Sequence, residues 1–218
     1  MISFPDKKYS IIYADPPWRY SDKGCSGNAQ AHYPTMAIDD ICRLPVSTIS
    51  SDCCVLFLWA TYPMLQEAFK VIDAWGFTYK SIAFQWIKQN HSGNGYFFGL
   101  GRWTRGNTEP CLLATKGKPI RGTGHMVFDW FTWERDGKDV PKIHPTQKPQ
   151  SVLKKLIETF TDAGDTVIDP CAGSGSTLRA AYELGRNSYG FEISRDFCKL
   201  ANEKMLDFSD AEDQQRLF

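Results

Sequence analysis

Short apolar runs alternate along the chain with stretches in which apolar residues recur every three or four positions. The runs have the length of buried strands, and Gly, Pro or polar residues end them. The recurring positions are typical of amphipathic helices, most clearly over residues 63–75 and 150–161. Strands that alternate with helices indicate an α/β fold, in which a mainly parallel central sheet has helices on both faces. The strands are expected at residues 11–14, 53–60, 77–88 and 109–115, within 128–133, and at 166–169 and 187–191, and further helices at 39–44, 176–184 and 194–206.

Three polar, Gly-containing stretches interrupt this alternation, near residues 19–36, 90–107 and 117–147. Their length is typical of functional loops rather than of ordinary connections. No internal repeat is visible, and 218 residues is the size of one domain. We therefore expect a single domain over residues 1–218, with the three stretches inserted as loops for target recognition.

The composition is typical of a folded cytoplasmic protein. Hydrophobic residues make up 42% of the chain and charged residues 23%. No apolar run has the length of a membrane span, and the first residues do not resemble a signal peptide, so no membrane association is expected. The seven cysteines form no C-x-x-C pair and the four histidines do not cluster with them. We expect reduced thiols and no metal site.

The net charge is zero, but the charges are unevenly distributed. Residues 100–148 carry nine Lys or Arg against five Asp or Glu, and residues 149–218 carry eight against twelve. A basic middle section and an acidic end fit a polyanion bound on one side of the molecule. Chance variation of the surface fits this distribution nearly as well.

The stretch IIYADPPWRY, residues 11–20, places polar groups at the end of the first expected strand. Asp15 ends the apolar run, and Pro16 and Pro17 prevent a strand or a helix from continuing. Open α/β sheets bind ligands at this end of their strands. Asp15 and the Pro16 carbonyl could each accept one N–H of an amine on a heteroaromatic ring, and Trp18 could stack on that ring. An ordinary strand end with Trp18 in the core fits these residues about as well.

A second polar turn follows the expected strand at residues 166–169. Asp169 ends this strand, and Gly173 and Gly175 would let the backbone approach a ligand closely before a helix begins. Glu192 ends the next strand, 23 residues after Asp169, where a carboxylate commonly binds both ribose hydroxyls. The turn has no G-K-[ST] pattern, and its carboxylate would repel a pyrophosphate. These residues favour an adenosine with a charged amino-acid tail over a nucleotide.

The segment HPTQKP, residues 144–149, precedes the expected helix at 150–161. From this position Lys148 could reach a carboxylate of the cofactor. In the alternative interpretation, Pro149 begins the helix and Lys148 is a solvated charge at its end. The residues alone favour the solvated charge.

Together, DPPW, HPTQKP and DPCAGSGST resemble the S-adenosylmethionine-dependent amino-methyltransferases. The order of the motifs is similar to that of the permuted class β DNA methyltransferases. DPPW resembles the motif of one branch of this family. That branch is shared by the mRNA adenosine methyltransferases and many phage and bacterial DNA adenine methyltransferases. The resemblance extends from about residue 9 to residue 205. It implies a Rossmann-like methyltransferase fold, S-adenosyl-L-methionine as the cofactor, and the exocyclic amine of adenine in DNA as the target, in the cytoplasm of a bacterial or phage-infected cell.

The resemblance also implies roles for individual residues. Asp15 and Pro16 would hold the amine, and Pro17 and Trp18 would shape its pocket. A base in a duplex would be flipped out, with Trp18 and Tyr20 stacking on it. The residues implied for the cofactor are His144, Lys148, Asp169, Ala172, Gly173, Gly175 and Glu192.

Basic residues of the middle section are expected to contact the phosphates of the nucleic acid, although a solvated surface charge is as good an interpretation of any one of them. They are Arg102, Arg105, Lys116, Lys118 and Arg121. Arg102, Arg105, Asn107 and Glu109 also match a family stretch that closes over the site, without an individual role for each.

Other targets and one inactive state stay open. RNA adenosine and the cytosine amine of DNA are alternative acceptors. An inactive, methyltransferase-like subunit would position nucleic acid for a partner, but it would be expected to lose Asp15 or the cofactor glycines. Only 26 residues follow Glu192, so the strand that usually contacts the cofactor adenine is not expected. Specificity is expected to come from the three loops, with a short recognition sequence, a structured substrate, a homodimer or a partner subunit.

Overall fold

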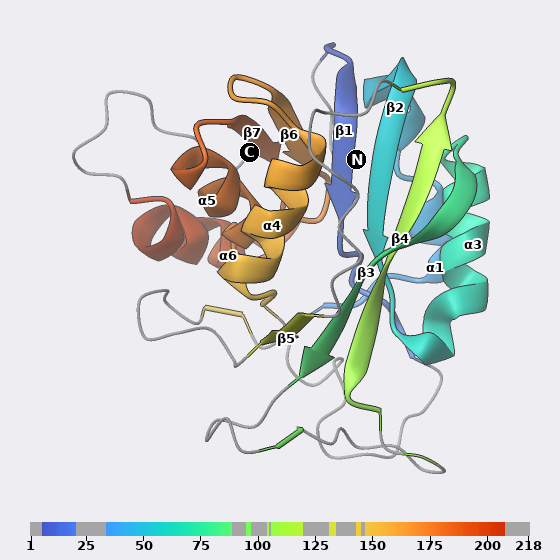
Figure 1. The fold of residues 1–218 in the computed structure, drawn as a ribbon, viewed down its shortest axis with the longest axis horizontal. Helices are drawn as coiled ribbons and strands as arrows, with labels where there is room; N and C mark the ends of the chain where they lie inside the picture. The colour runs from blue at the N-terminus through green and yellow to red at the C-terminus, as the bar shows by residue number, and fades with distance from the viewer. Residues whose placement is uncertain are drawn as a thin grey trace.

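A seven-stranded sheet forms the centre of the protein (Figure 1). The computed structural model describes residues 6–20, 34–88, 95–96, 104, 106–119, 131–133, 143–144 and 147–207. The strands follow one another across the sheet in the order β5-β3-β4-β2-β1-β6-β7. They are β1 (Tyr9–Ala14), β2 (Ser50–Trp59), β3 (Thr78–Lys88), β4 (Thr108–Lys116), β5 (Phe131–Trp133), β6 (Thr166–Asp169) and β7 (Asn187–Gly190).

One strand, β4, runs against all the others. β1 pairs in parallel with β2 and β6, β6 with β7, and β3 with β5, whereas β4 is antiparallel to both β2 and β3. The expected mainly parallel sheet is therefore confirmed. The carboxyl ends of six strands meet at one edge of the sheet, and β4 begins at that same edge. Its first residues thus lie near the ends of the parallel strands, and Lys116 lies at the opposite edge.

Helices cover both faces of the sheet (Figure 1). On one face, Ile12 and Ala14 of β1 pack in a core with residues of the helix α3 (Leu65–Ala74). On the other face, Ile11 and Tyr13 pack in a core with residues of α4 (Gln150–Phe160) and α5 (Ser176–Glu183). This alternation along β1 is the two-residue period of a strand buried on both sides, which is why the run reads as continuously apolar.

The other helices agree with the expected pattern in part. The short helix α1 (Ile38–Cys42) and the 3₁₀ turn η2 (Tyr62–Met64) fall where helical residues were predicted, whereas α2 (Val46–Ile49) was not predicted. The Ser194 hydroxyl accepts the N–H of Phe197 and so caps α6 (Arg195–Leu200), which continues as the π-helical turn η3 (Ala201–Met205). Within the described part of the chain, no helix is long and apolar enough to span a membrane.

Candidate active site

A cavity of about 600 Å³ lies at the edge of the sheet where the parallel strands end. Its volume is in the usual range for small-molecule sites. β1 and β6 are hydrogen-bonded neighbours, so the turns that follow them leave the sheet side by side. The structure therefore brings the two polar turns to one cavity. The predicted residues that line it are Asp15, Pro16, Pro17, Trp18, Tyr20, His144, Lys148, Asp169, Ala172, Gly173 and Glu192.

The turn after β1 is held by its own backbone. The Pro16 carbonyl accepts the N–H of Trp18 at 2.8 Å, and the Pro17 carbonyl accepts the N–H of Met36 at 2.9 Å. A carbonyl oxygen has two lone pairs, so the Pro16 carbonyl retains one for a ligand. Two prolines and two backbone hydrogen bonds thus fix the direction of this acceptor beside Asp15.

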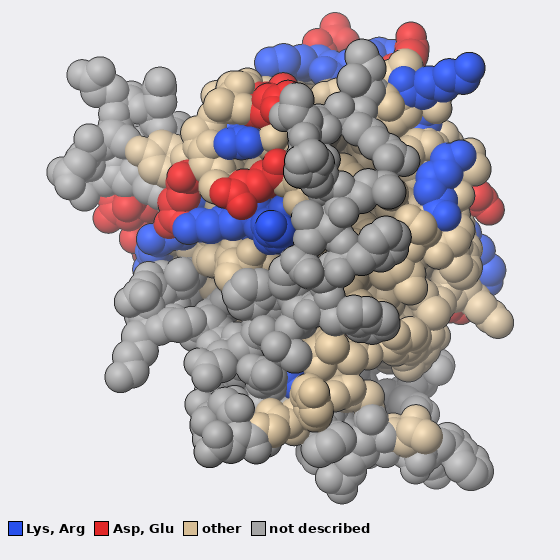
Figure 2. Space-filling view, viewed as in Figure 1, with Lys and Arg blue, Asp and Glu red and all other residues tan. Residues whose placement is uncertain are grey.

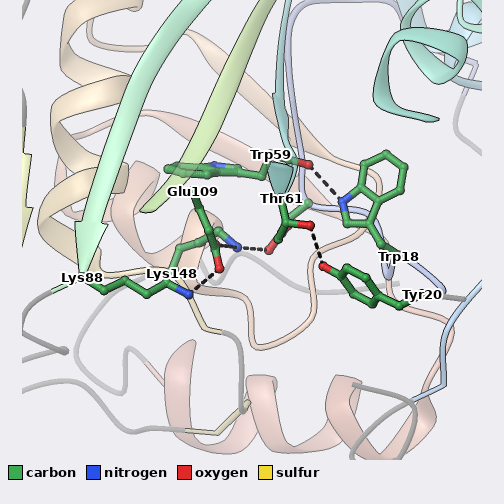
Figure 3. Close-up of polar contacts among 8 residues, drawn as sticks. Trp18, Tyr20, Trp59, Thr61, Lys88, Glu109 and Lys148 are labelled. Atoms are coloured by element: carbon green, nitrogen blue, oxygen red, sulfur yellow. Dashed lines mark hydrogen bonds and ion pairs between the residues drawn. The ribbon is translucent and has the colours of Figure 1, made fainter. Parts of the chain in front are cut away.

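The two aromatic residues of this turn have different environments (Figure 3). Trp18 is only 4% exposed and its indole Nε1 donates to the Trp59 carbonyl at 3.1 Å. Trp18 lines the cavity but is buried, and its role as a stacking face stays a prediction. Tyr20 is half-buried on the cavity wall, and its hydroxyl is 2.8 Å from the Thr61 hydroxyl.

Two lysines and two carboxylates form a network beside the amine motif (Figure 3). The Lys148 Nζ lies 2.6 Å from an Asp15 oxygen and 3.4 Å from a Glu109 oxygen. Glu109, near the start of β4, also pairs with Lys88 at the end of β3. Lys148 is 6% exposed, so the interpretation of this residue as a solvated charge is wrong.

Burial and ion pairing act against each other in this network. Burial raises the pKa of Asp15 above its usual value, although the Lys148 ammonium opposes this. Burial also acts to raise the pKa of Glu109, but Lys148 and Lys88 outweigh it, and that pKa is lowered. Burial acts to lower the pKa of Lys148, and its two carboxylate partners outweigh that as well, so its pKa is raised. Lys148 is thus a cation and Glu109 an anion at neutral pH.

The turn after β6 has the backbone shape that its glycines predict. Gly173 and Gly175 have φ angles of +53° and +76°, which residues other than glycine rarely adopt. The Gly173 N–H donates to one Glu192 oxygen at 2.9 Å, and the Ser194 N–H donates to the other at 2.7 Å. Glu192 therefore connects the glycine turn to the end of β7. Gly175 is the N-cap of α5 and, unlike Gly173, is not among the residues that line the cavity.

Asp169 is a buried carboxyl group facing the cavity. It is 2% exposed, and one of its oxygens accepts the N–H of Cys171 at 3.0 Å. Burial raises its pKa to about 7, even though hydrogen bonds from Thr177 and Cys171 act in the opposite direction. A cationic ligand group would therefore be well placed to ionise Asp169 and pair with it.

An apolar and uncharged wall lies beyond Glu192. The ring of His144 packs against that of Phe197, with centroids 4.5 Å apart. Burial, aided by Lys148, lowers the pKa of His144 to about 4, so its imidazole is neutral at physiological pH. Ile193 is 64% exposed at the rim. Carboxylates at the turn and apolar side chains beside them fit an adenosine that carries a cationic amino-acid tail.

Two of the basic residues predicted to contact phosphate, Lys116 and Lys118, lie away from this cavity. Lys116 ends β4 at the opposite edge of the sheet, where its Nζ donates to the Ser50 hydroxyl at 3.0 Å, and Lys118 follows it. A duplex seated over the cavity and confined to that edge would not reach them. Arg102, Arg105 and Arg121, like most of the three expected loops, lie outside the described residues.

Basic and acidic side chains are mixed over α4 and α5 on the face shown in Figure 2. Lys154 and Arg179 both pair with Glu183, at 2.5 and 2.7 Å. One carboxylate therefore offsets part of the charge of both cations. On this face α4 and α5 present mixed charges rather than a continuous basic surface.

Reasoning from the sequence missed some residues of the cavity. Glu109 was identified only as part of a family stretch, although a carboxylate at the start of an apolar strand is a usable signal. Thr61 follows the end of β2, and strand ends are where ligand-contacting residues concentrate. Ile193 and Phe197 follow Glu192, and no local pattern marks them.

The doubly covered sheet and the cavity shared by its two polar turns have the layout expected of an S-adenosylmethionine-dependent methyltransferase. A family model described as DNA methylase matches residues 116–203. The type II methyltransferase M.MunI of a Mycoplasma species is 36% identical over 177 residues, which cover 72% of this chain and 69% of that protein. The chain belongs to this DNA methylase family: it is a DNA methyltransferase that uses S-adenosyl-L-methionine as its cofactor.

Solved structures share the fold. The protein TTHA0409 of Thermus thermophilus, in complex with S-adenosyl-L-methionine, superposes with a TM-score of 0.66 at 19% identity, over 99% of this chain and 92% of that one. The PvuII cytosine-N4-specific DNA methyltransferase superposes with a TM-score of 0.65 at 17% identity, over 96% and 83%. At these identities the likeness confirms the Rossmann-like methyltransferase fold that the motifs implied.

Proposed function

We propose that this DNA methyltransferase acts on the exocyclic amine of adenine. The observation that carries the proposal is that Asp15 and Pro16 line the same cavity as Asp169 and Glu192. The intact DPPW motif favours adenine, because the resemblance of that motif is to adenine methyltransferases. The cytosine amine stays the second candidate, since a cytosine-N4-specific enzyme has the same fold.

The amine motif would both position and activate the target. When bound, S-adenosyl-L-methionine supplies a methyl group that is electrophilic because it is attached to a sulfonium. Asp15 and the Pro16 carbonyl accept the two N–H groups of the amine and pull its nitrogen toward pyramidal geometry, which restores the lone pair. The Asp15 carboxylate then stabilises the positive charge that develops on the nitrogen. The displacement leaves a methylated ammonium, which is acidic, so its proton leaves afterwards, to Asp15 or to water.

The cofactor side of the cavity would hold its ligand by charge and by shape. Asp169 would pair with the ammonium of the amino-acid tail, and Ala172 and the Gly173 turn would line that tail. The Glu192 carboxylate has about four acceptor sites, and those not used by its backbone donors would take the ribose hydroxyls. Ile193 and Phe197, with the neutral His144 beside them, would flank the adenine.

A flipped base would stack on Tyr20 rather than on Trp18, because Tyr20 is the partly exposed ring of the two. The Thr61 hydroxyl holds the Tyr20 hydroxyl and so limits rotation of the ring. Arg102, Arg105 and Arg121 stay the proposed phosphate contacts. We do not propose that Lys116 and Lys118 contact the phosphates of the duplex that presents this base.

Cofactor affinity is expected to increase as the pH rises toward 7. The pKa of Asp169 is raised to about 7 in the empty site, so the carboxyl is protonated below that pH and must lose its proton to pair with an ammonium. The dissociation constant measured by calorimetry should therefore fall by up to about tenfold per pH unit from about pH 5.5 to 7, with a proton released on binding. Asp169→Asn should bind more weakly, with a nearly flat profile. An equally steep profile in this variant would contradict the assignment.

The target is identified by mapping the methylated base. The protein is incubated with methyl-labelled cofactor and with DNA and RNA of matched random sequence, and the digested nucleosides are separated by mass spectrometry. N6-methyladenine in DNA is the expected product. If the product were N4-methylcytosine, the target would be the cytosine amine. If label appeared in RNA alone, the target would be RNA. Cofactor binding without any product would indicate an inactive subunit.

A further inference from the structure

Lys148 is the buried group that the proposed reaction does not yet use. It precedes α4, yet its ammonium reaches across 133 residues of sequence to Asp15. The 2.6 Å distance to the Asp15 oxygen is that of a charge-assisted hydrogen bond. The same Nζ is 5.2 Å from the centre of the Trp59 ring. These contacts of the side chain are thus with the amine side of the cavity.

We propose that Lys148 is a positioning residue of the amine pocket, which holds the Asp15 carboxylate ionised and aimed at the target amine, and that Glu109 and Lys88 hold Lys148 in place. The proposal rests on the proposed function, because it assigns a partner to the carboxylate that grips the amine. It differs from the role that family resemblance implies, in which Lys148 lies on the cofactor.

The first reason is the position of Asp15 between solvent and core. Its side chain is 26% exposed and burial works against its charge. A neutral carboxyl would carry a proton where the amine N–H must be accepted, and it would stabilise a developing positive charge poorly. A fixed cation at hydrogen-bond distance favours the ionised form and selects one orientation of the carboxylate.

The second reason is that Lys148 is itself held from the far side. Its side chain is 7% exposed, and an ammonium so buried needs more than one anionic partner. Glu109 supplies the second carboxylate at 3.4 Å, and Lys88 pairs with Glu109 in turn. Two cations and two anions balance one another. The pocket therefore stays near neutral until charge develops on the amine.

Other titratable groups also act on Asp15. Lys148 stands before α4, Glu109 on β4 and Lys88 on β3. Asp169 at the end of β6 and Tyr20 after β1 interact with Asp15 as well. Other titratable groups that interact with it are Tyr13, Cys111 and Cys171. Among these, Lys148 lowers the pKa of Asp15 most, and Glu109 raises it. Neutralising Lys148 and neutralising Glu109 should therefore have opposite effects, which a loss of structure alone would not produce.

The test compares Lys148→Met, Lys148→Arg and Glu109→Gln in the whole chain by single-turnover methylation of DNA from pH 5.5 to 9.5. In Lys148→Met the acidic limb of the rate–pH profile should move to higher pH by about 1–3 pH units, so that the rate lost at low pH is regained at high pH. In Glu109→Gln the acidic limb should move to lower pH. Lys148→Arg keeps the cation and should keep the wild-type limb. Calorimetry should give each variant a cofactor affinity within about threefold of wild type, a change of under 1 kcal/mol.

The possible failures are distinguishable. If wild-type protein methylates no nucleic acid, the proposed function and this proposal both fail. If wild type is active and Lys148→Met weakens cofactor binding by about 30-fold or more with an unmoved limb, Lys148 holds the cofactor and only this proposal fails. If Lys148→Met does not fold, the same limb in Glu109→Gln as in wild type overturns the proposal.

Discussion

Asp15→Asn is expected to reduce the single-turnover rate of methyl transfer by about 10³-fold, or about 4 kcal/mol of transition-state stabilisation. The change keeps the shape of the side chain and one acceptor oxygen. It removes the negative charge that would face the developing positive charge, and it places an NH₂ group where an acceptor is needed. The loss should therefore appear in the chemical step.

Binding and folding should be affected little by this change. Cofactor affinity should stay within about threefold of wild type, because Asp169 and Glu192 are untouched. Lys148 keeps Glu109 at 3.4 Å as an anionic partner, so the fold should survive, with a lower melting temperature. Asp73→Asn is the matched control: Asp73 is exposed on α3, away from the cavity, and this variant should be fully active. A rate for Asp15→Asn within tenfold of wild type would remove Asp15 from the mechanism.

Glu192→Ala is expected to weaken cofactor binding by about 100-fold. The carboxylate accepts the N–H groups of Gly173 and Ser194, and we propose that it also takes the ribose hydroxyls. Hydrogen bonds to a charged group contribute about 1.5–3 kcal/mol each, so loss of two toward the ligand accounts for a change of at least this size. Release of the Gly173 turn would add to it.

The intermediate variant Glu192→Gln should weaken binding by about tenfold, because it keeps one oxygen acceptor but loses the charge. Glu203→Gln serves as the control, since the Glu203 side chain is 54% exposed on η3. Calorimetric titration with S-adenosyl-L-methionine measures all three variants. If Glu192→Ala bound the cofactor as wild type does, the ribose contact would have to be assigned to another residue.

The parts of the site that could be predicted are those that local sequence determines. Asp15 and Asp169 each end an apolar run, and the prolines and glycines after them restrict the backbone whatever the rest of the chain does. Parallel strands then bring their ends to one edge. The cavity shared by the two turns follows from these features alone.

The missed contacts depend on long-range packing. The ion pair between Lys148 and Asp15 exists only because α4 packs over the end of β1. Glu109 reaches the cavity, and Lys116 the opposite edge, because β4 is reversed in the sheet. An apolar run has the same pattern in a parallel and in an antiparallel strand, so neither placement could be predicted from the sequence. The buried indole of Trp18 donates to the carbonyl of Trp59, which is 41 residues away in sequence, so this contact is also long-range.

A crystal structure of the protein with a non-reactive analogue of S-adenosyl-L-methionine and a DNA duplex containing the mapped target site would test the central claim most directly. That claim is one cavity in which the turn after β6 holds the methyl donor and the turn after β1 grips the amine. We expect the target base out of the duplex, with its amino nitrogen about 3 Å from an Asp15 oxygen and from the Pro16 carbonyl. The analogue should contact Asp169 and Glu192. A base that enters elsewhere, or an amino group that faces away from Asp15, would contradict it.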